Sequence, residues 1–271
     1  MKWVTQMNYD RIITMSFVGP LVSALLLLCA IPAQSEDIAT TTENSVGVSL
    51  SAYNYEEPGY MSLKATTAGI EYAGTYAFKT EWPEQDMPWF IHGDLRYANG
   101  AADYRSPISG SINDTINWYA EGRLLLGKDF AFSNFVLAPY VGVGLRHSHN
   151  DLRRHPRGYR RDTSYVSIPV GVTHKTKMPD LYVLSTTVEY IHLLQGLHKA
   201  KMSDFNATVG DLSMKQKTGH GFRLSTMARF GNISFGPSLS YWKVADSNID
   251  KGFIEPMNKT YEIGIKANYH F

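Results

Sequence analysis

The sequence is poor in three features that often define a protein's class: cysteine, charge of one sign and long apolar runs. Its 271 residues include one cysteine, which excludes an internal disulfide framework and a zinc site built on several cysteines. The net charge is +1, so the strong positive field of a nucleic-acid-binding protein is absent. After residue 35 no stretch approaches 18 uninterrupted apolar residues, which excludes a second helical membrane span. Aromatic residues are plentiful, at 13% of the chain.

The first 35 residues differ in character from all that follows. Lys2 and Arg11 precede an apolar run over residues 12–32, and a small-residue cleavage pattern ends at Ser35, directly before two acids. This order predicts a secretory signal peptide over 1–35, cleaved after Ser35, and a mature domain over 36–271. Two alternatives stay open, namely an uncleaved inner-membrane anchor and a start at a later methionine.

The mature domain alternates apolar and polar residues with a period of two. Near the C-terminus every second residue from Tyr261 to Phe271 is apolar, and the residues between them include Glu262 and Lys266. This alternation gives a β-strand one apolar and one polar face. Soluble strands average about 5–6 residues, whereas a tilted strand needs about 9–11 residues to cross a bilayer. Ten segments of membrane-crossing length alternate in this way: 45–55, 66–78, 89–98, 116–127, 135–146, 164–174, 181–192, 220–230, 233–243 and 260–271.

The connections between these segments also alternate, in length. Those at 79–88, 128–134, 175–180 and 231–232 are shorter, and those at 99–115, 147–163, 193–219 and 244–259 are long and polar. Short turns at one end and long loops at the other are typical of an outer-membrane β-barrel. Aromatic residues at segment ends are the expected interfacial belts; they are Tyr53, Tyr55, Tyr76, Phe78, Trp89, Tyr97, Trp118, Phe135, Tyr241, Trp242 and Phe271.

These patterns predict an all-β fold, a transmembrane antiparallel β-barrel of about ten strands. Eight or twelve strands also stay open, because segments 45–55 and 164–174 have the weakest pattern. The rival fold is a secreted soluble β-sandwich or lipocalin-like barrel, whose apolar face would point inward and whose strands would be shorter. An apolar face rich in Gly, Ala and Leu, opposed by a face that holds most of the charges, favours lipid outside and polar groups inside.

Several stretches resemble small Gram-negative outer-membrane barrel proteins. They include the sequences at 139–146, 165–171, 189–190, 241–247 and 255–262. The chain also ends in an alternating strand with Tyr269 and Phe271, an ending that is similar to the signal read by the barrel-assembly machinery. The resemblance implies a location in the outer membrane among lipid and lipopolysaccharide, a barrel fold and that assembly route. Such relatives are largely uncharacterised or porin-like, so the resemblance implies no substrate.

The polar face of a ten-stranded barrel would line a narrow lumen. Barrels near eight strands are filled by side chains, and sixteen or more leave a water channel. Unpaired charges in so small a space are unfavourable, so paired networks are expected. We predict either a filled lumen or a narrow pore that selects small solutes. The predicted lumen charges are Glu71, His92, Asp94, Arg96, Glu121, Arg123, Arg146, Glu189, Arg223, Arg229, Glu262 and Lys266.

The predicted loop 146–163 is rich in arginine. Beyond Arg146 it contains Arg153, Arg154, Arg157, Arg160 and Arg161. On an extracellular loop these guanidinium groups would bind lipopolysaccharide phosphates or another anionic surface ligand, although a solvated basic loop is the simpler interpretation.

The same loop also raises the question of catalysis. His147 and His149 with Asp151 suggest a metal site or a catalytic base, and Ser148 lies between the histidines, but a nucleophile needs an orienting acid that the sequence does not identify. The glycines at 142 and 144 lie inside a strand, which argues against a nucleotide site. We therefore predict a structural or narrow porin-like barrel without cofactor or metal and without enzymatic activity. The alternatives are a binding module for anionic ligands and a rim hydrolase acting on lipid A or phospholipid.

Overall fold

A computed structural model describes residues 38–78, 88–179 and 182–271. The predicted signal peptide, its cleavage position and most of the predicted turn at 79–88 lie outside these residues. Within the described ranges, no helix is long and apolar enough to cross a membrane.

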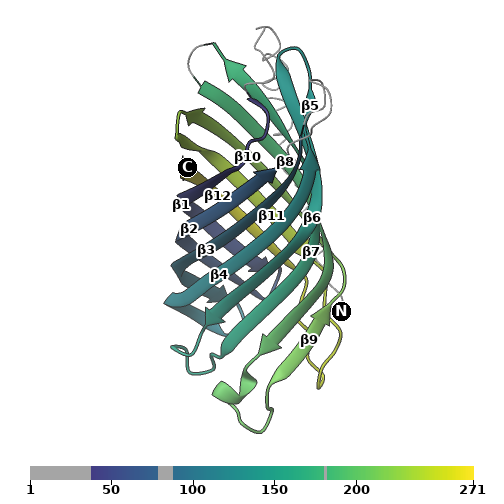
Figure 1. Ribbon diagram of the computed structural model, residues 1–271. Helices are drawn as coiled ribbons and strands as arrows, with labels where there is room; N and C mark the ends of the chain where they lie inside the picture. Colours follow the sequence, from purple (N-terminus) through teal and green to yellow (C-terminus); the bar gives the residue numbers. More distant parts are fainter. Residues whose placement is uncertain (1–37, 79–87, 180–181) are drawn as a thin grey trace, which may run out of the picture.

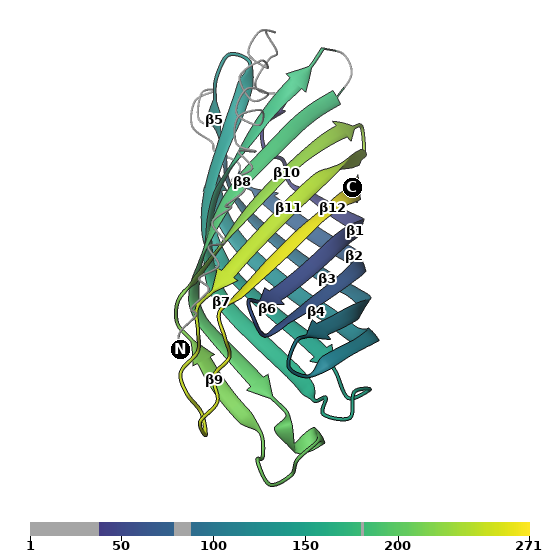
Figure 2. The ribbon, with the colours of Figure 1, turned by 180° about the vertical axis from the view of Figure 1, so that it is seen from behind.

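Ten antiparallel strands form a closed barrel (Figures 1 and 2). Each pairs with its neighbour along the chain, β8 pairs with β10, and β1 pairs with β12 to close the ring. The strands are β1 (Glu43–Glu57), β2 (Met61–Ala77), β3 (Trp89–Ser106), β4 (Gly110–Lys128), β6 (Phe135–Asp151), β7 (Arg160–Met178), β8 (Tyr182–Ala200), β10 (Gly219–Phe230), β11 (Ile233–Val244) and β12 (Asn258–His270). The ten predicted strands and the all-β barrel class are confirmed, and the eight- and twelve-stranded alternatives are excluded.

Three smaller elements lie outside the ring. Strand β5 (Phe130–Ala131) pairs with β6, and β9 (Leu212–Gln216) pairs with β8. The 3-10 helix η2 (Met202–Asp204) precedes β9. Strands β5 and β9 project at opposite ends of the barrel (Figure 1). We call the end with β5, the start of β1 and the end of β12 the turn end, and the end with β9 the loop end.

Most strands run further toward the loop end than predicted. Strand β3 continues to Ser106 and β4 begins at Gly110, so the predicted loop 99–115 is mainly a paired hairpin. Likewise β8 reaches Ala200, and β9 lies within the predicted loop 193–219. The physical reason is that the pattern reverses beyond the membrane: apolar residues such as Leu63 and Ala102 are buried inside, and polar residues such as Lys64 lie outside, so the membrane-type alternation stops there.

The outer surface of the barrel is apolar where lipid would cover it. Ile70, Leu95 and Ile263 expose 65%, 63% and 61% of their surface. Aromatic pairs flank this band: Tyr182 and Phe230 lie on the turn-end side, and Tyr190 and Phe222 lie on the loop-end side. The eight residue steps from Phe222 to Phe230 correspond to about 21 Å of height at about 3.4 Å per residue and about 40° of tilt, close to the roughly 25 Å apolar band of outer-membrane barrels.

Three of the predicted belt aromatics point inward instead. Tyr53 and Trp242 are buried, and Tyr55 donates a hydrogen bond to Glu57 inside the barrel at 2.9 Å. Their positions fall in the inward register of β1 and β11, because Ser51 on β1 and Ser234 on β11 are buried on the same face. Large aromatic groups therefore fill the lumen toward the loop end rather than anchoring the barrel in lipid.

A glycine on the inner face of β6 allows close strand packing. A Cβ atom at Gly142 would lie 2.1 Å from the backbone oxygen of Leu124 on β4. Any larger residue would push the two strands apart. The close approach of β6 to β4 therefore depends on a glycine at this position.

Candidate functional site: the charged barrel interior

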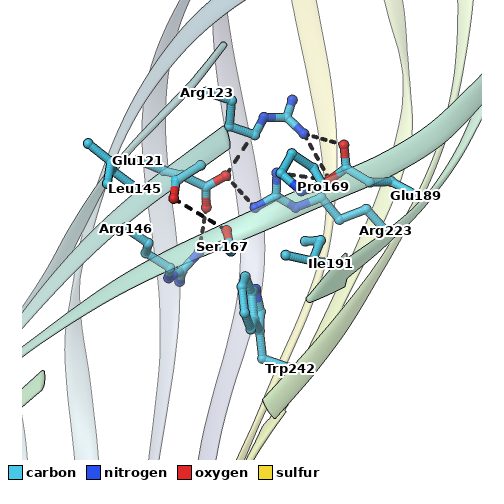
Figure 3. A pocket seen from close by; sticks show the side chains of 11 residues that line it. Glu121, Arg123, Leu145, Arg146, Ser167, Pro169, Glu189, Ile191, Arg223 and Trp242 are labelled. Atoms are coloured by element: carbon cyan, nitrogen blue, oxygen red, sulfur yellow. Dashed lines mark hydrogen bonds and ion pairs between the residues drawn. The ribbon is translucent and has the colours of Figure 1, made fainter. Parts of the chain in front are cut away.

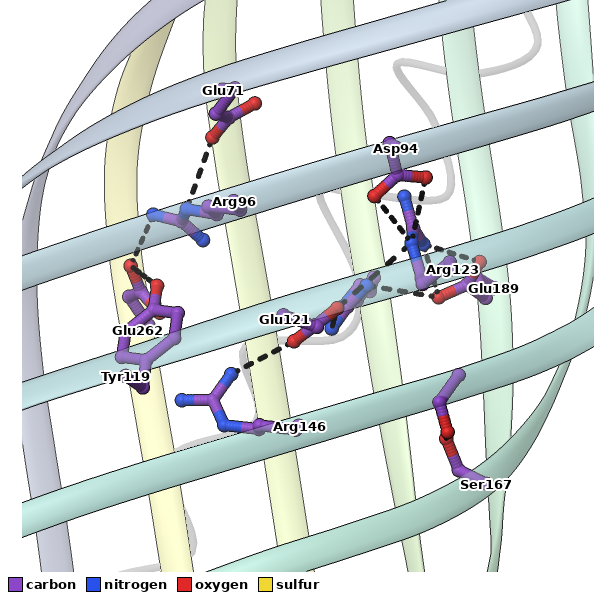
Figure 4. Close-up of polar contacts among 12 residues, drawn as sticks. Glu71, Asp94, Arg96, Tyr119, Glu121, Arg123, Arg146, Ser167, Glu189 and Glu262 are labelled. Carbon is purple, nitrogen blue, oxygen red and sulfur yellow. Dashed lines mark hydrogen bonds and ion pairs between the residues drawn. The ribbon is translucent and has the colours of Figure 1, made fainter.

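The centre of the lumen is occupied by guanidinium groups that bridge the barrel wall. Arg123 on β4 contacts Asp94 on the neighbouring β3 through Nε at 3.0 Å. It also contacts Glu189 on β8 through Nη1 at 2.8 Å, and Tyr140 donates a hydrogen bond to that carboxylate at 2.9 Å. Asp94 and Glu189 lie on strands that do not pair, so Arg123 connects different sides of the lumen (Figure 4).

Glu121 forms the second node of this network. Its carboxylate accepts from Arg146 at 3.1 Å and from Arg223, and Arg123 lies 3.9 Å away. The guanidinium of Arg146 also lies 3.8 Å from the centre of the Tyr119 ring, which is a cation–π contact. Figure 3 shows Glu121 surrounded by these cations, which come from three different strands.

A third node lies toward β1 and β12. Arg96 contacts Glu71 at 3.0 Å and Glu262 at 2.6 Å. Tyr119 donates a hydrogen bond to the same Glu262 carboxylate at 2.8 Å. Lys266 approaches Glu71 from the other side at 3.0 Å. The three nodes lie side by side across the lumen (Figure 4).

Every one of the twelve predicted lumen residues takes part in an ion pair. Besides the three nodes, His92 contacts Asp94 at 3.5 Å, and Arg229 contacts Glu43 at 2.8 Å near the turn end. Glu43 was missed in the sequence because it precedes the first segment that alternates clearly.

A second group of polar contacts, which the sequence does not identify, lies at the turn end. Asp129 is buried and accepts hydrogen bonds from the backbone nitrogen of Thr40 at 2.5 Å and from its hydroxyl at 2.8 Å. Lys175 lies 3.7 Å from the same carboxylate. Residues ahead of β1 therefore fold into the turn end, where the Ile38 side chain is buried. Asp129 and Lys175 fall in the predicted short turns, where alternation does not indicate which side chains point inward.

The loop end of the lumen has its own buried cluster, and it corrects the prediction for Arg161. This residue is not on a surface loop: it lies in β7 with 3% exposure and contacts Glu57 and Glu255, the latter at 2.5 Å. His198 lies 3.2 Å from the second oxygen of Glu255. Arg161 shares the inward register of β7 with Tyr165, so its side chain enters the barrel rather than solvent.

A cavity of about 10 Å³ lies among Glu121, Arg123 and Glu189 (Figure 3), which is room for a single water molecule. A larger, open depression of about 490 Å³ lies at the loop end, between the β1–β2 and β3–β4 turns.

The other predicted loop arginines are largely engaged by the protein itself. Arg153 contacts Asp151 at 2.6 Å, Arg160 contacts Asp204 at 2.8 Å, and Arg154 donates to a backbone oxygen at 2.9 Å. Hydrogen bonds from Arg160 hold the pKa of Asp204 below its usual range. Arg157 is exposed on the β6–β7 connection. The basic run is thus a set of local ion pairs more than an open cationic surface.

The histidines do not meet Asp151 as the sequence suggested. Asp151 is engaged by Arg153, whereas His149 Nδ1 lies 2.6 Å from Asp162 Oδ1 on the neighbouring β7. His147 Nδ1 lies 2.9 Å from the Ser164 hydroxyl, also on β7. Across the part of the chain that the structure describes, no three His, Cys, Asp or Glu side chains gather as a metal site would require. The sequence does not reveal Asp162 and Ser164 as partners of the histidines, because they come next to them only through the pairing of β6 and β7.

Comparison with known proteins agrees with this architecture. A family model described as the outer membrane protein beta-barrel domain matches residues 21–210. The outer membrane protease OmpT from Escherichia coli has a similar structure, with a TM-score of 0.52 and 12% identity over 85% of this chain and 96% of that one.

Two other solved structures are more distant. The translocator domain of autotransporter NalP from Neisseria meningitidis has a TM-score of 0.41 and 9% identity, covering 86% of this chain and 89% of that one. Neisserial surface protein A has a TM-score of 0.36 and 9% identity, covering 84% and 97%. No curated protein matches the chain. At these identities the structural likeness concerns the fold alone.

Proposed function

The chain belongs to the family of outer membrane proteins with a beta-barrel domain, and from that premise we propose that it is a closed barrel that serves as a structural surface protein. The observation that supports this most directly is the ion-pair network that crosses the lumen around Glu121, Arg123 and Arg96. A pore needs a continuous water path, and the cavity beside Glu121, Arg123 and Glu189 has room for one water molecule.

The loop end is the part that would act at the cell surface. Outer-membrane barrels keep short turns in the periplasm and longer loops outside, so we orient the loop end outward. Strand β8 continues ten residues beyond the belt residue Tyr190, to Ala200. At about 3.4 Å per residue and about 40° of tilt, this extends the wall about 26 Å past the outer interface.

Hydrogen bonds to the β11–β12 connection give this extension a firm edge. The edge of β9 that faces away from β8 is covered by that connection. Asn248 accepts a hydrogen bond from the Lys215 backbone nitrogen at 2.5 Å, and Asp250 accepts one from the Ser213 backbone nitrogen at 2.7 Å. A covered edge resists pairing with other chains. The protein would therefore present a rigid, non-aggregating wall outside the membrane.

A solute efflux assay tests the closed lumen. Liposomes that contain the refolded protein and a trapped small sugar should lose the sugar no faster than protein-free liposomes. An open porin in the same lipid provides the positive control. Efflux that grows with the amount of folded barrel, and that is absent with heat-denatured protein, would replace the closed barrel by a narrow porin.

A second prediction concerns assembly. The Phe271 side chain is 61% exposed, while its backbone nitrogen and oxygen pair with Asn44 at 2.9 and 2.8 Å at the barrel seam. We propose that Tyr269 and Phe271 form the signal for the barrel-assembly machinery. Phe271→Ala keeps the seam bonds, so it should lower the amount of barrel in the outer membrane several-fold while leaving the refolded protein equally stable.

Phe132→Ala is the matched control for that prediction. Phe132 lies at the same turn end and is 46% exposed, but it is far from the C-terminus in sequence. Quantitative blots of outer-membrane fractions should show normal levels for this variant. Equal losses in both variants would mean that exposed aromatic surface, rather than a terminal signal, determines assembly.

A further inference from the structure

A polar cluster lies on the outer surface of the barrel, away from the lumen network. The side chains of His147 and His149 on β6 lie on the same outward face as Leu145, which is 61% exposed. Asp162 and Ser164 on β7 lie opposite them in the strand register, His149 against Asp162 and His147 against Ser164. The lumen proposal gives this cluster no role, because none of its members faces the lumen.

The polar side chains of the cluster contact one another in a continuous series. Ser164 Oγ lies 2.9 Å from His147 Nδ1, and the opposite nitrogen of that ring, Nε2, lies 3.9 Å from Asp162 Oδ1. Asp162 Oδ1 is held in turn by His149 Nδ1 at 2.6 Å. A hydroxyl, an imidazole and a carboxylate thus stand in the order of an activated serine nucleophile, with the serine within hydrogen-bond reach of the imidazole and the carboxylate at ion-pair distance from it.

The height of the cluster matches the ester region of a membrane. Trp118 belongs to the outer aromatic belt through its contact with Tyr97, at 5.9 Å between ring centres. The same Trp118 ring stacks on His149 at 5.5 Å and lies 5.4 Å from His147. Aromatic belts mark the level of lipid headgroups, and the acyl esters of a lipid lie at the border between headgroup and hydrocarbon. Toward the hydrocarbon, Leu145 and Val166 offer apolar surface along which an acyl chain would lie.

We propose that Ser164, His147 and Asp162 form an interfacial esterase site that hydrolyses acyl esters of membrane lipids. His147 Nδ1 takes the Ser164 proton as Oγ bonds to the ester carbonyl carbon. The bond from that carbon to the alkoxy oxygen then breaks, and the leaving alcohol takes the proton from His147. Water next attacks the acyl-serine and gives its proton to His147. The fatty acid then leaves, and Oγ recovers the proton.

The flanking groups give each partner a defined task. Asp162 is a positioning residue: it stabilises the imidazolium that forms at His147, and the bond from His149 fixes its orientation. Lys199 on β8 stands opposite Asp162 in the strand register and is exposed. Its ammonium group brings positive charge to the same outer face, which suits the anionic phosphate of a lipid headgroup.

Covalent labelling tests the nucleophile. The folded wild-type barrel in micelles is treated with a fluorophosphonate probe, whose phosphorus bonds to an activated serine as fluoride leaves, and the labelled peptide is identified by mass spectrometry. We expect an adduct at Ser164 and a rate at least about 100-fold lower in His147→Ala, because a general base typically contributes that much. Asp162→Asn should lower the maximal labelling rate while leaving the half-saturating probe concentration unchanged.

Turnover tests the substrate class. Vesicles of phosphatidylglycerol and phosphatidylethanolamine with wild-type protein should release free fatty acid, and Ser164→Ala should abolish that release. Ser148→Ala is the matched control, because it removes a hydroxyl from an adjacent position that faces the lumen. Heat-modifiable migration confirms that each variant is folded. The absence of a Ser164 adduct, an equal rate in His147→Ala, or the absence of fatty-acid release overturns the proposal.

Discussion

Replacing Glu121 by alanine is expected to destabilise the folded barrel by about 3–5 kcal/mol, the usual effect of removing one partner of a buried ion pair. The Glu121 side chain is buried and contacts Arg146 at 3.1 Å as well as Arg223. Without it, Arg223 keeps a contact with Glu189 at 3.5 Å, but Arg146 loses its one acidic partner among the described residues. The free energy of unfolding is measured by urea titration in phospholipid vesicles, with heat-modifiable gel migration as the readout.

Two further variants test whether the stability lost in Glu121→Ala comes from the unpaired Arg146 guanidinium. The double variant Glu121→Ala/Arg146→Met removes the stranded charge and should recover part of the stability, since apolar replacement of a whole buried pair is often neutral. Asp211→Ala breaks an exposed ion pair with Lys201 and should leave the urea midpoint unchanged. An unchanged midpoint in Glu121→Ala would mean that the lumen is wet enough to solvate Arg146.

Replacing Arg161 by alanine is expected to have a comparable effect, concentrated at the loop end. Arg161 joins three segments, because it lies on β7 while Glu57 ends β1 and Glu255 lies in the β11–β12 connection. Its removal leaves two buried carboxylates facing each other around Tyr55, at a cost of about 3–5 kcal/mol. The β11–β12 connection should open more often, so trypsin should cleave after the exposed Lys251 at least about ten times faster.

Arg157→Ala serves as the matched control for Arg161. It removes an arginine from the same basic run, but from an exposed position on the β6–β7 connection. Cleavage after Lys251, followed by mass spectrometry, should keep the wild-type rate in this variant. If Arg157→Ala and Arg161→Ala behave alike, Arg161 acts as a surface residue and its burial in the loop-end cluster is wrong.

The sequence predicts the membrane-spanning half of the fold well because lipid imposes a strict pattern there. Lipid outside and charge inside force alternation, as in β12, where Ile263 and Ile265 face outward and Glu262 and Lys266 face inward. Beyond the outer belt the pattern reverses, because apolar residues such as Leu63 are buried inside the barrel and polar residues such as Lys64 face water. The sequence pattern therefore predicts a loop where the structure has the hairpin of β3 and β4 around Ser106 and Gly110.

The sequence predicts which residues face the lumen, but not their partners. Alternation assigns Arg123 and Glu189 to the inner face, whereas their 2.8 Å contact depends on the curvature of the sheet, which turns β4 and β8 toward the same lumen. Arg161 was misassigned for a related reason. Its run of arginines looks like one loop, while its partners Glu57 and Glu255 are far away in sequence. The same limit hid Asp162 and Ser164, which meet the histidines only through the pairing of β6 and β7.

Single-channel recording of the refolded wild-type barrel in a planar bilayer tests the closed lumen most directly. The network around Glu121, Arg123 and Arg96 predicts a silent protein, with no discrete current steps above the leak of the bare membrane. The variant Tyr119→Gly/Arg146→Ala removes two large lumen side chains and should produce steps in the same apparatus. Stable, ion-selective steps from the wild-type protein, at a frequency that follows the amount of folded barrel, would contradict the account.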